Sequence, residues 1–532
     1  MTNPILALEG ASYVLPDGTT LFSDLSAQFD QRHTGLVGRN GAGKTVLARI
    51  LAGQLQPSAG RCVRMGSVHY LAQQVTPAVD STVAGIACLQ GTLDALERIE
   101  AGGTDPVDFD TVNDQWDIRQ RFKQELDRYG LAHLEASTPA HMLSGGESMC
   151  VGLTGALLRD VDYLILDEPS NHLDRPHRHA LIEQLRRWPN GLLVISHDRQ
   201  LLDSTDRILE LSSLGLRSYG GNYTFYAHCK TQERQSAEQQ LERRRQEQGM
   251  RDQQERQERR MARGNRHGKE ANQARILLDR QKERSEHATG KLRQQHAAAR
   301  EQLNQRVRDA AQQVEDDAPI TVHSVPVEQV AQRRVVELDQ VVLPFVSGAT
   351  RSISLVLTGQ QRVGVLGRNG CGKSTLLKLV AGMLQPVRGS CKVSPACMYL
   401  DQQLAHLDPQ CSVLEQAQAA NTNANETDMR MRLAQLGLDA KKVMTPSGLL
   451  SGGERLKAAL ACVLYASPPP QLLLLDEPSN HLDLSSSQAL ETMLRSYRGA
   501  LVVVSHDDAF LNALGLRERL AAGDWGWRME LW

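Results

Sequence analysis

The 532-residue sequence predicts an α/β protein in which two copies of one domain are joined by a long α-helical hairpin linker. Five motifs occur twice in the same order, which indicates two homologous domains. The segment between the two copies has no aromatic residue and is rich in charged side chains. Hydrophobic residues make up 41% of the chain but aromatic residues only 4%. This balance is typical of aliphatic α/β cores and long helices rather than of aromatic-rich β-sandwiches.

The two copies can be aligned motif by motif. GRNGAGKT at residues 38–45 returns as GRNGCGKS, 329 residues later. The other pairs are YLAQQ and YLDQQ, LSGGE twice, ILDEPSNHLD and LLDEPSNHLD, and VISHD and VVSHD. The offset falls to 307 at LSGGE, so the first copy has 22 extra residues before that motif. We place this insertion within about residues 88–130 and expect a turn between two short helices there.

The repeats place a first domain at residues 1–226, a charged linker at 227–318 and a second domain at 319–532. The chain is nearly neutral, with 60 Lys and Arg against 62 Asp and Glu, which excludes a uniformly basic nucleic-acid binder. Because we find neither a bilayer-length apolar stretch nor a secretory signal, we expect a cytoplasmic protein. The nine Cys never form C-x-x-C, which favours reduced thiols over disulfides or a zinc site.

The linker concentrates the basic charge. Between residues 229 and 309 there are 21 Lys and Arg against 13 Asp and Glu, and no Pro. Its Gln, Glu, Arg, Lys and Ala favour helix, and the turn-like residues 264–268 predict a hairpin whose arms reach on the order of 50 Å. Around this tip only Glu270 opposes the positive charge of Arg259, Arg260, Arg263, Arg266, Lys269 and Arg275.

Each GRNG motif predicts a phosphate-binding loop, because it lies between a strand-like and a helix-like segment. Backbone N–H groups would cradle phosphates, Lys44 and Lys373 would neutralise their charge, and Thr45 and Ser374 would ligate Mg²⁺. A glycine turn without a ligand is the alternative, and two matches with the same downstream order argue against it. The remaining predicted loop residues are Gly38, Arg39, Asn40, Gly41, Ala42 and Gly43, and Gly367, Arg368, Asn369, Gly370, Cys371 and Gly372.

Acidic residues follow an apolar strand in each copy. Asp167 and Asp476 end these strands and are placed to hold Mg²⁺ through water at the carboxyl edge of a parallel sheet. Glu168 and Glu477 come one residue later and are placed to polarise the attacking water. Isolated D-E pairs usually lie in solvated loops, but these pairs belong beside a phosphate-binding loop.

His197 and His506 follow other apolar strands of the two copies. A single histidine at such a position is more often structural than catalytic. Since S-H-D recurs in both copies, we expect each histidine to contact the γ-phosphate.

Together these motifs resemble the ATP-binding cassette superfamily, in the order Walker A, glutamine loop, signature, Walker B with its glutamate, and switch histidine. The resemblance implies two P-loop NTPase cassette domains that form a head-to-tail sandwich. Walker A of one cassette would face the signature of the other, with two ATP molecules at the interface. It also implies that Gln73 and Gln402 are the glutamine loops, and that the signature contacts are Ser144, Gly145 and Gly146, and Ser451, Gly452 and Gly453.

A closer resemblance is to the ABC-F proteins, which have two cassettes in one chain, no membrane domain and a charged helical linker. N-H-L-D at 171–174 and 480–483 and G-N-Y at 221–223 look like motifs of that family. The resemblance implies a monomeric ATP hydrolase that binds the ribosome and sets its linker tip against tRNA or rRNA, as a translation factor or an antibiotic-protection protein. The basic charge of the linker tip is consistent with an RNA contact, because neutralising phosphates drives sequence-independent RNA binding.

Other functions use similar cassettes. A cassette pair that energises a separate membrane transporter has little use for a long basic hairpin. A chromosome ATPase usually carries a much longer coiled coil, and an excision-type DNA-repair ATPase would bring zinc cysteines. The linker as a mere solvated spacer is the simplest alternative, and the charge at its tip argues against it.

The two ATP sites are expected to differ. Tyr13 would stack on adenine beside the first loop, whereas aligning EGASYVLP with ELDQVVLP puts Val341 at the equivalent position. Phe345, four positions on, is the candidate substitute. Without it, we expect weaker nucleotide binding at the Lys373 loop.

The signatures differ as well. Residues 148–150 read Ser-Met-Cys where 455–457 read Arg-Leu-Lys. Gly152 and Gly155 are expected to weaken the helix after the first signature. Because the first signature would face the Lys373 loop, this difference falls on the same ATP site.

Overall fold

The computed structural model describes residues 6–74, 80–171, 173–237, 239–240, 242–243, 334–401, 404, 406–480 and 482–532. The chain forms two compact units, one of Met1–Tyr226 with Ile320–Trp532 and one of Ala227–Pro319. The predicted hairpin turn and its basic residues, like Gln402, lie outside the described residues. In the second unit, residues 227–237 are helical. Among the described residues no helix is long and apolar enough to cross a membrane.

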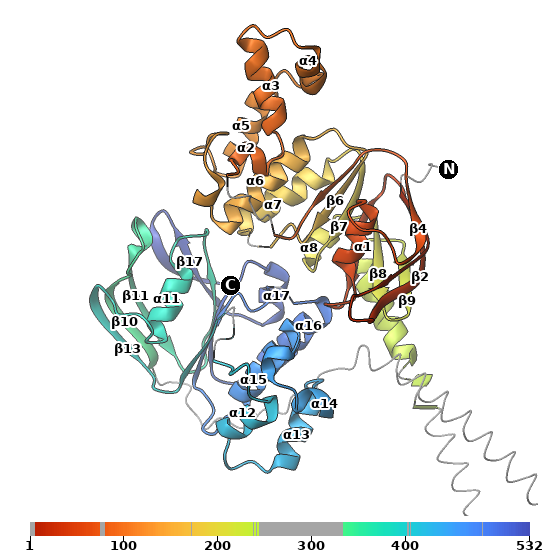
Figure 1. The fold of residues 1–532 in the computed structure, drawn as a ribbon. Helices are drawn as coiled ribbons and strands as arrows, with labels where there is room; N and C mark the ends of the chain where they lie inside the picture. The colour runs from red at the N-terminus through yellow and green to blue at the C-terminus, as the bar shows by residue number, and fades with distance from the viewer. Residues whose placement is uncertain are drawn as a thin grey trace, which may run out of the picture. The chain divides into compact units, whose positions relative to one another are not determined.

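The first cassette combines a six-stranded and a three-stranded sheet (Figure 1). The larger sheet has the order β5-β6-β7-β3-β8-β9 and is parallel except for β9. Strands β6 and β7 are buried at every residue, as expected for continuous apolar runs covered on both faces. The bounds are β3 His33–Gly38, β5 Val68–Leu71, β6 Tyr163–Asp167, β7 Gly191–Ile195, β8 Arg207–Ser212 and β9 Gly215–Tyr219, with β1 Leu6–Val14, β2 Thr20–Phe29 and β4 Ala59–Arg64 in the antiparallel sheet.

The second cassette repeats this topology strand by strand. Its large sheet has the order β14-β15-β16-β12-β17-β18, and its small sheet the order β11-β10-β13. The predicted fold of two homologous α/β cassettes is therefore confirmed. The bounds are β10 Arg334–Val342, β11 Ser352–Thr358, β12 Arg362–Leu366, β13 Arg388–Val393, β14 Cys397–Leu400, β15 Leu472–Asp476, β16 Ala500–Val504, β17 Glu518–Gly523 and β18 Gly526–Leu531.

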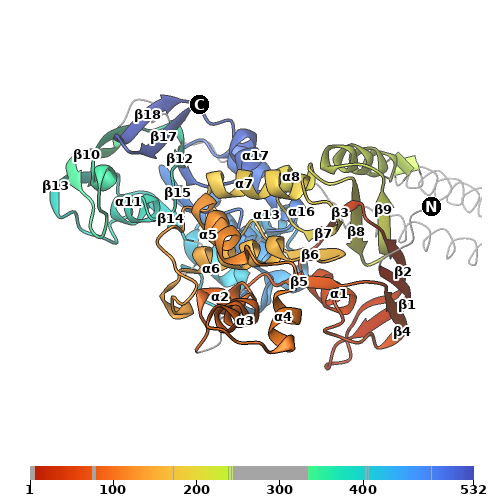
Figure 2. The same cartoon turned by 90° about the horizontal axis from the view of Figure 1, so that it is seen from above.

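Helices begin within or directly after four of the five repeated motifs, so these motifs lie where strands or loops meet helix N-termini. Helix α1 contacts both sheets of the first cassette (Figure 2). The signature reads S-x-x-E because it is a capping box: in each cassette the serine and glutamate side chains cap the helix that follows. The bounds are α1 Lys44–Leu51, α6 Gly145–Leu158, α7 Arg175–Arg186 and α8 Arg199–Leu202, and their counterparts α11 Lys373–Val380, α15 Gly452–Leu464, α16 Leu484–Ser496 and α17 Asp508–Ala513.

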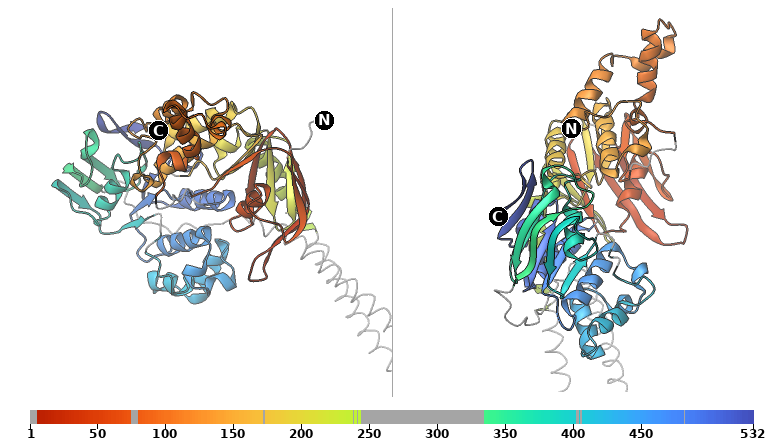
Figure 3. Two further views of the ribbon diagram at one scale, coloured as in Figure 1. Left: turned by 45° about the horizontal axis from the view of Figure 1, so that its top comes forward. Right: turned by 90° about the vertical axis from the view of Figure 1, so that its left-hand side faces the viewer.

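A helical region follows the glutamine loop in each cassette. In the first it includes a pair of short helices, α3 and α4, which stands out from the cassette (orange in Figure 3). Arg98 on α3 contacts Asp108 on α4 at 2.6 Å, and Asp105 caps α4. The bounds are α2 Val83–Ile86, α3 Gln90–Glu100, α4 Pro106–Val112 and α5 Ile118–Arg128 in the first cassette and α12 Val413–Ala420, α13 Glu426–Gln435 and α14 Ala440–Val443 in the second, with short 3-10 turns at Ala140–Met142, Ala349–Arg351 and Ser447–Leu449.

The glycines of α6 do not interrupt it. The helix passes through Gly152 and Gly155 and has 14 residues, against 13 in α15. A Cβ atom added to Gly155 would lie 2.1 Å from the carbonyl oxygen of Ala87. Gly155 therefore lets the backbone that follows α2 pack closely against α6, a role that the sequence did not reveal.

Candidate functional site

The two phosphate-binding loops have the same internal geometry. Lys44 Nζ donates to the carbonyl oxygens of Gly38 and Arg39 at 2.6 and 3.0 Å. In the second loop Lys373 Nζ donates to the equivalent carbonyl oxygens, both at 2.9 Å. Burial lowers the pKa of Lys44, and the carboxylate of Glu168 opposes that shift. Each lysine is thus held in the middle of its loop, where it can meet phosphate oxygens.

The predicted magnesium ligands lie next to each other. Ser374 Oγ donates to Asp476 Oδ1 at 3.1 Å, and the Thr45 side chain lies beside Asp167, where it partly offsets the rise in the pKa of that carboxyl caused by burial. A hydroxyl and a carboxylate supply hard oxygen ligands, and Mg²⁺ is commonly completed by phosphate oxygens and water. The residues therefore fit Mg²⁺ bound together with a nucleotide.

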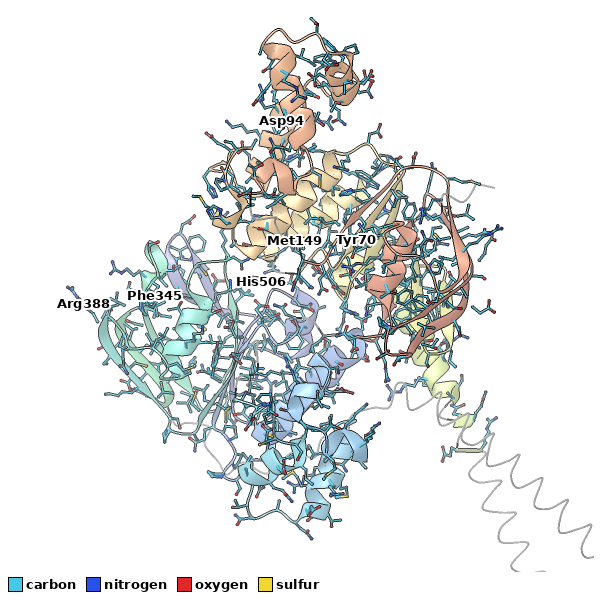
Figure 4. All side chains as sticks on the ribbon, viewed as in Figure 1. Tyr70, Asp94, Met149, Phe345, Arg388 and His506 are labelled. Atoms are coloured by element: carbon cyan, nitrogen blue, oxygen red, sulfur yellow. The ribbon has the colours of Figure 1, made fainter. Side chains whose placement is uncertain are left out.

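Two tyrosines support these carboxylates. Tyr70 and Tyr399 donate their phenol hydroxyls to Asp167 Oδ2 and Asp476 Oδ2, each at 3.1 Å. Sequence reasoning used only the glutamines of YLAQQ and YLDQQ and missed these tyrosines. The recurrence of tyrosine in both motifs was the signal. Tyr70 is labelled in Figure 4. The predicted glutamine-loop residue Gln73 is half-buried and lies just after β5.

Glu168 and Glu477 are buried beside the switch histidines. His197 Nε2 lies 3.4 Å from Glu168 Oε1, and His506 Nε2 lies 3.4 Å from Glu477 Oε1. Burial raises the pKa of both glutamates and lowers the pKa of both histidines. A glutamate with a raised pKa is suited to accept a proton from an attacking water.

The backbone at these glutamates is unusual. Both have φ of +49°, in the left-handed region that non-glycine residues rarely adopt. The N–H of Glu168 donates to the carbonyl oxygen of Ile195 at 2.8 Å, and that of Glu477 to Val504 at 2.9 Å. These bonds to the neighbouring strand hold each carboxylate over the sheet edge.

Each phosphate-binding loop is completed by the opposite cassette. Asp483 Oδ2 accepts the backbone N–H of Asn40 at 3.0 Å, and Asp174 Oδ2 accepts that of Asn369 at 3.2 Å. Each aspartate also caps the helix that follows it. The sequence shows the N-H-L-D motifs but does not predict that their aspartates lie in the ATP sites.

The first signature and the second phosphate-binding loop line the same cavity, which has a volume of about 1160 Å³. Such a volume is ample for a nucleotide. In this cavity Cys150 stands at the position where the other signature has Lys457. At the other site burial lowers the pKa of Lys457, while Asp483 opposes that shift and Arg39 adds to it. The cavity lining includes Ser144, Gly145, Gly146, Phe345, Lys373, Ser374, Asp476, Glu477 and His506.

An aromatic side chain is present at both loops. Tyr13 is half-buried with its ring centroid 6.3 Å from that of Phe22. Val341 is fully buried, whereas Phe345, labelled in Figure 4, is 95% exposed. Phe345 is one of the residues that line the cavity. The structure thus places the predicted substitute, Phe345, on the cavity that contains the Lys373 loop. Base stacking on Phe345 and the unequal nucleotide affinity of the two sites both stay predictions.

Replacing Phe345 by alanine is expected to weaken nucleotide binding at the Lys373 site by roughly fivefold to a hundredfold, because stacking on a base contributes about 1 to 3 kcal/mol. The measurement is an equilibrium nucleotide titration in a Lys44→Ala background, where only this site binds. Tyr13→Ala in that background is the control and should change nothing. Unchanged affinity after Phe345→Ala would contradict the assignment.

Comparison with known proteins gives consistent matches. The family model described as "ABC transporter" matches residues 23–171 and 350–480. The tylosin resistance ATP-binding protein TlrC of Streptomyces fradiae is 31% identical over 97% of this chain and 98% of its own length. The energy-dependent translational throttle protein EttA of Mycobacterium tuberculosis is 32% identical over 90% of this chain and 84% of its own length.

Solved structures share the fold at lower identity. A structure of the RNase-L Inhibitor superposes with a TM-score of 0.57 at 18% identity, covering 98% of this chain and 90% of that one. The archaeal ribosome recycling factor aABCE1, solved in complex with the ribosomal stalk protein aP1, gives 0.54 at 18% identity over 98% and 89%. These likenesses support the tandem-cassette architecture.

Proposed function

Because the chain belongs to the ABC-F family of ATP-binding cassette proteins, we propose that it binds the ribosome in an ATP-dependent way and acts there on translation. The chain is an ATP hydrolase with two cassettes. One relative is named for throttling translation and another for resistance to tylosin. The observation that carries the proposal is the completion of each phosphate-binding loop by the aspartate of the opposite cassette. Because both cassettes contribute to each ATP site, ATP binding can hold the two cassettes in the closed form.

We assign roles to the site residues from the geometry described above. Lys44 and Lys373 would bind the β- and γ-phosphates, and Mg²⁺ would be held by the hydroxyl and carboxylate pairs at the sheet edges. When bound, the ion would neutralise developing phosphate charge. Glu168 and Glu477 would each accept a proton from the attacking water. His197 and His506 would fix those carboxylates and the γ-phosphate.

We assign the RNA contact to the basic linker tip. Its arginines and Lys269 would neutralise phosphates of tRNA or rRNA. The net charge of the linker sequence supports this role, and a cytoplasmic location belongs to the same proposal. A cassette pair serving a separate membrane transporter is the competing function, and it predicts partition with membranes.

Sedimentation of the full-length chain tests the proposal. A Glu168→Gln, Glu477→Gln variant loaded with ATP should pellet with purified ribosomes, and it should not do so without nucleotide. Changing Arg259, Arg260, Arg263, Arg266 and Lys269 to Gln in this variant should flatten the salt dependence of binding by roughly 0.7 to 0.9 log units per log salt for each lost phosphate contact. Helix propensity is nearly unchanged by this exchange.

Two outcomes would contradict the proposal. Partition with a membrane fraction instead of ribosomes would favour the transporter function. Ribosome affinity and salt dependence equal to those of the unmodified tip would show that the linker is a spacer.

A further inference from the structure

Within the described residues and outside the ATP sites, two arginine–carboxylate ion pairs join the cassettes, and His179 Nε2 also lies 3.9 Å from Asp508 Oδ2. Arg199 Nη2 lies 2.7 Å from Glu491 Oε1, and these side chains are only 15% and 11% exposed. Arg175 Nε lies 3.1 Å from Asp508 Oδ2, with side chains 46% and 12% exposed. Gln200 Nε2 donates to the same Asp508 oxygen at 3.5 Å. Each of these contacts connects residues from different cassettes.

Arg199 and Asp508 occupy equivalent places in the two cassettes but carry opposite charge. Arg199 directly follows the first S-H-D and begins α8, and Asp508 directly follows the second and begins α17. Each reaches the helix that follows the opposite N-H-L-D motif, α16 in one case and α7 in the other. One cassette therefore presents a cation where the other presents an anion.

The helices that receive these charges are also not interchangeable. In the repeat, Glu491 of α16 corresponds to Ile182 of α7, and Arg175 of α7 corresponds to Leu484 of α16. Positions seven residues apart lie on one face of a helix. The receiving face of α7 thus carries Arg175, and that of α16 carries Glu491.

We propose that this charge pattern allows only unlike cassettes to close on each other. In a pair of first cassettes Arg199 would meet Ile182, with the like charge of Arg175 seven residues away on the same face of α7. In a pair of second cassettes Asp508 would meet Leu484, with the like charge of Glu491 seven residues away on the same face of α16. Like charges and buried charges without partners are strongly unfavourable. The linker then favours the unlike cassette of the same chain, because it raises that cassette's effective concentration.

The G-N-Y segment lies near the more buried pair. Tyr223 is only 8% exposed, and its phenol hydrogen-bonds to Gln488 on α16. Arg199 lies within electrostatic range of Tyr223. Closure of the cassettes therefore also fixes the residues that precede the linker, and we expect the Arg199–Glu491 pair to carry the larger effect.

Charge reversal tests the pair in the full-length Glu168→Gln, Glu477→Gln chain, where ATP is retained by closure. Arg199→Glu should speed ATP dissociation by about a hundredfold, because it leaves two buried acids facing each other. Arg199→Glu with Glu491→Arg should restore slow dissociation, which also shows that the fold is intact. The control is Arg186→Glu on α7, whose partner Glu183 lies on the same helix, and it should have no effect.

Swapping the charges of both cassettes tests the choice of partner. Arg199→Glu with Asp508→Arg should weaken closure within one chain and favour contact between like cassettes of two chains. With ATP, light scattering should then show dimers, whereas the chain with its natural charges stays monomeric. Adding Arg175→Glu and Glu491→Arg should return the monomer. If Arg199→Glu keeps ATP as slowly as its parent, or if the swapped chain stays monomeric with ATP retained, the proposal is overturned.

Discussion

Changing Glu168 and Glu477 together to glutamine is expected to lower steady-state ATP hydrolysis by about 10²- to 10⁴-fold without loss of ATP binding. Both carboxylates are buried, and each lies 3.4 Å from a switch histidine. Glutamine keeps the size and the hydrogen-bonding oxygen of the side chain but cannot take a proton from water. Phosphate release measures the first effect, and equilibrium ATP titration measures the second.

Single variants and a surface control complete this experiment. Each single glutamine variant should keep the activity of the other site. Glu183→Gln, an exposed position on α7, should hydrolyse ATP at the unmodified rate. If the double variant hydrolysed ATP at the unmodified rate, neither glutamate would be needed for hydrolysis.

Replacing Gly155 by alanine is expected to destabilise the first cassette by about 3 kcal/mol, which corresponds to a drop in its melting temperature of about 6 to 12 °C. The added Cβ would lie 2.1 Å from the carbonyl oxygen of Ala87, and backbone cannot give way as a flexible side chain can. Thermal unfolding of the full chain, followed at its first transition, is the measurement.

Gly91→Ala is the matched control. Gly91 lies on the exposed side of α3, with nothing within 4 Å of an added Cβ. There alanine should be neutral or stabilise by about 0.4 to 1 kcal/mol, because it restricts the unfolded chain and favours helix. If both variants melt alike, the contact between α6 and the backbone after α2 does not limit stability.

The fold and the main site residues could be predicted because the chain repeats itself. Each motif lies within a few residues of a strand end or a helix start, so its position in the sequence determines its position on the sheet edge. The apolar runs that end in Asp167 and Asp476 became buried strands. The serine and glutamate of each signature became a capping box.

The rest depends on contacts that no local pattern contains. Aligning the two copies makes Val341 the counterpart of Tyr13. In the structure, however, Val341 is buried in the core, and Phe345 lines the cavity instead. The Arg199–Glu491 contact joins residues 292 positions apart, in segments where a charged side chain looks like ordinary helix surface. Such features follow only from the way the two cassettes meet.

The left-handed backbone at Glu168 and Glu477 has a consequence for how this enzyme responds to selection. A non-glycine residue in that conformation costs on the order of 1 to 3 kcal/mol. Glycine would relieve the strain but would remove the carboxylate. Stability and turnover therefore compete at these two positions. A screen that rewards only heat resistance would tend to enrich inactive chains.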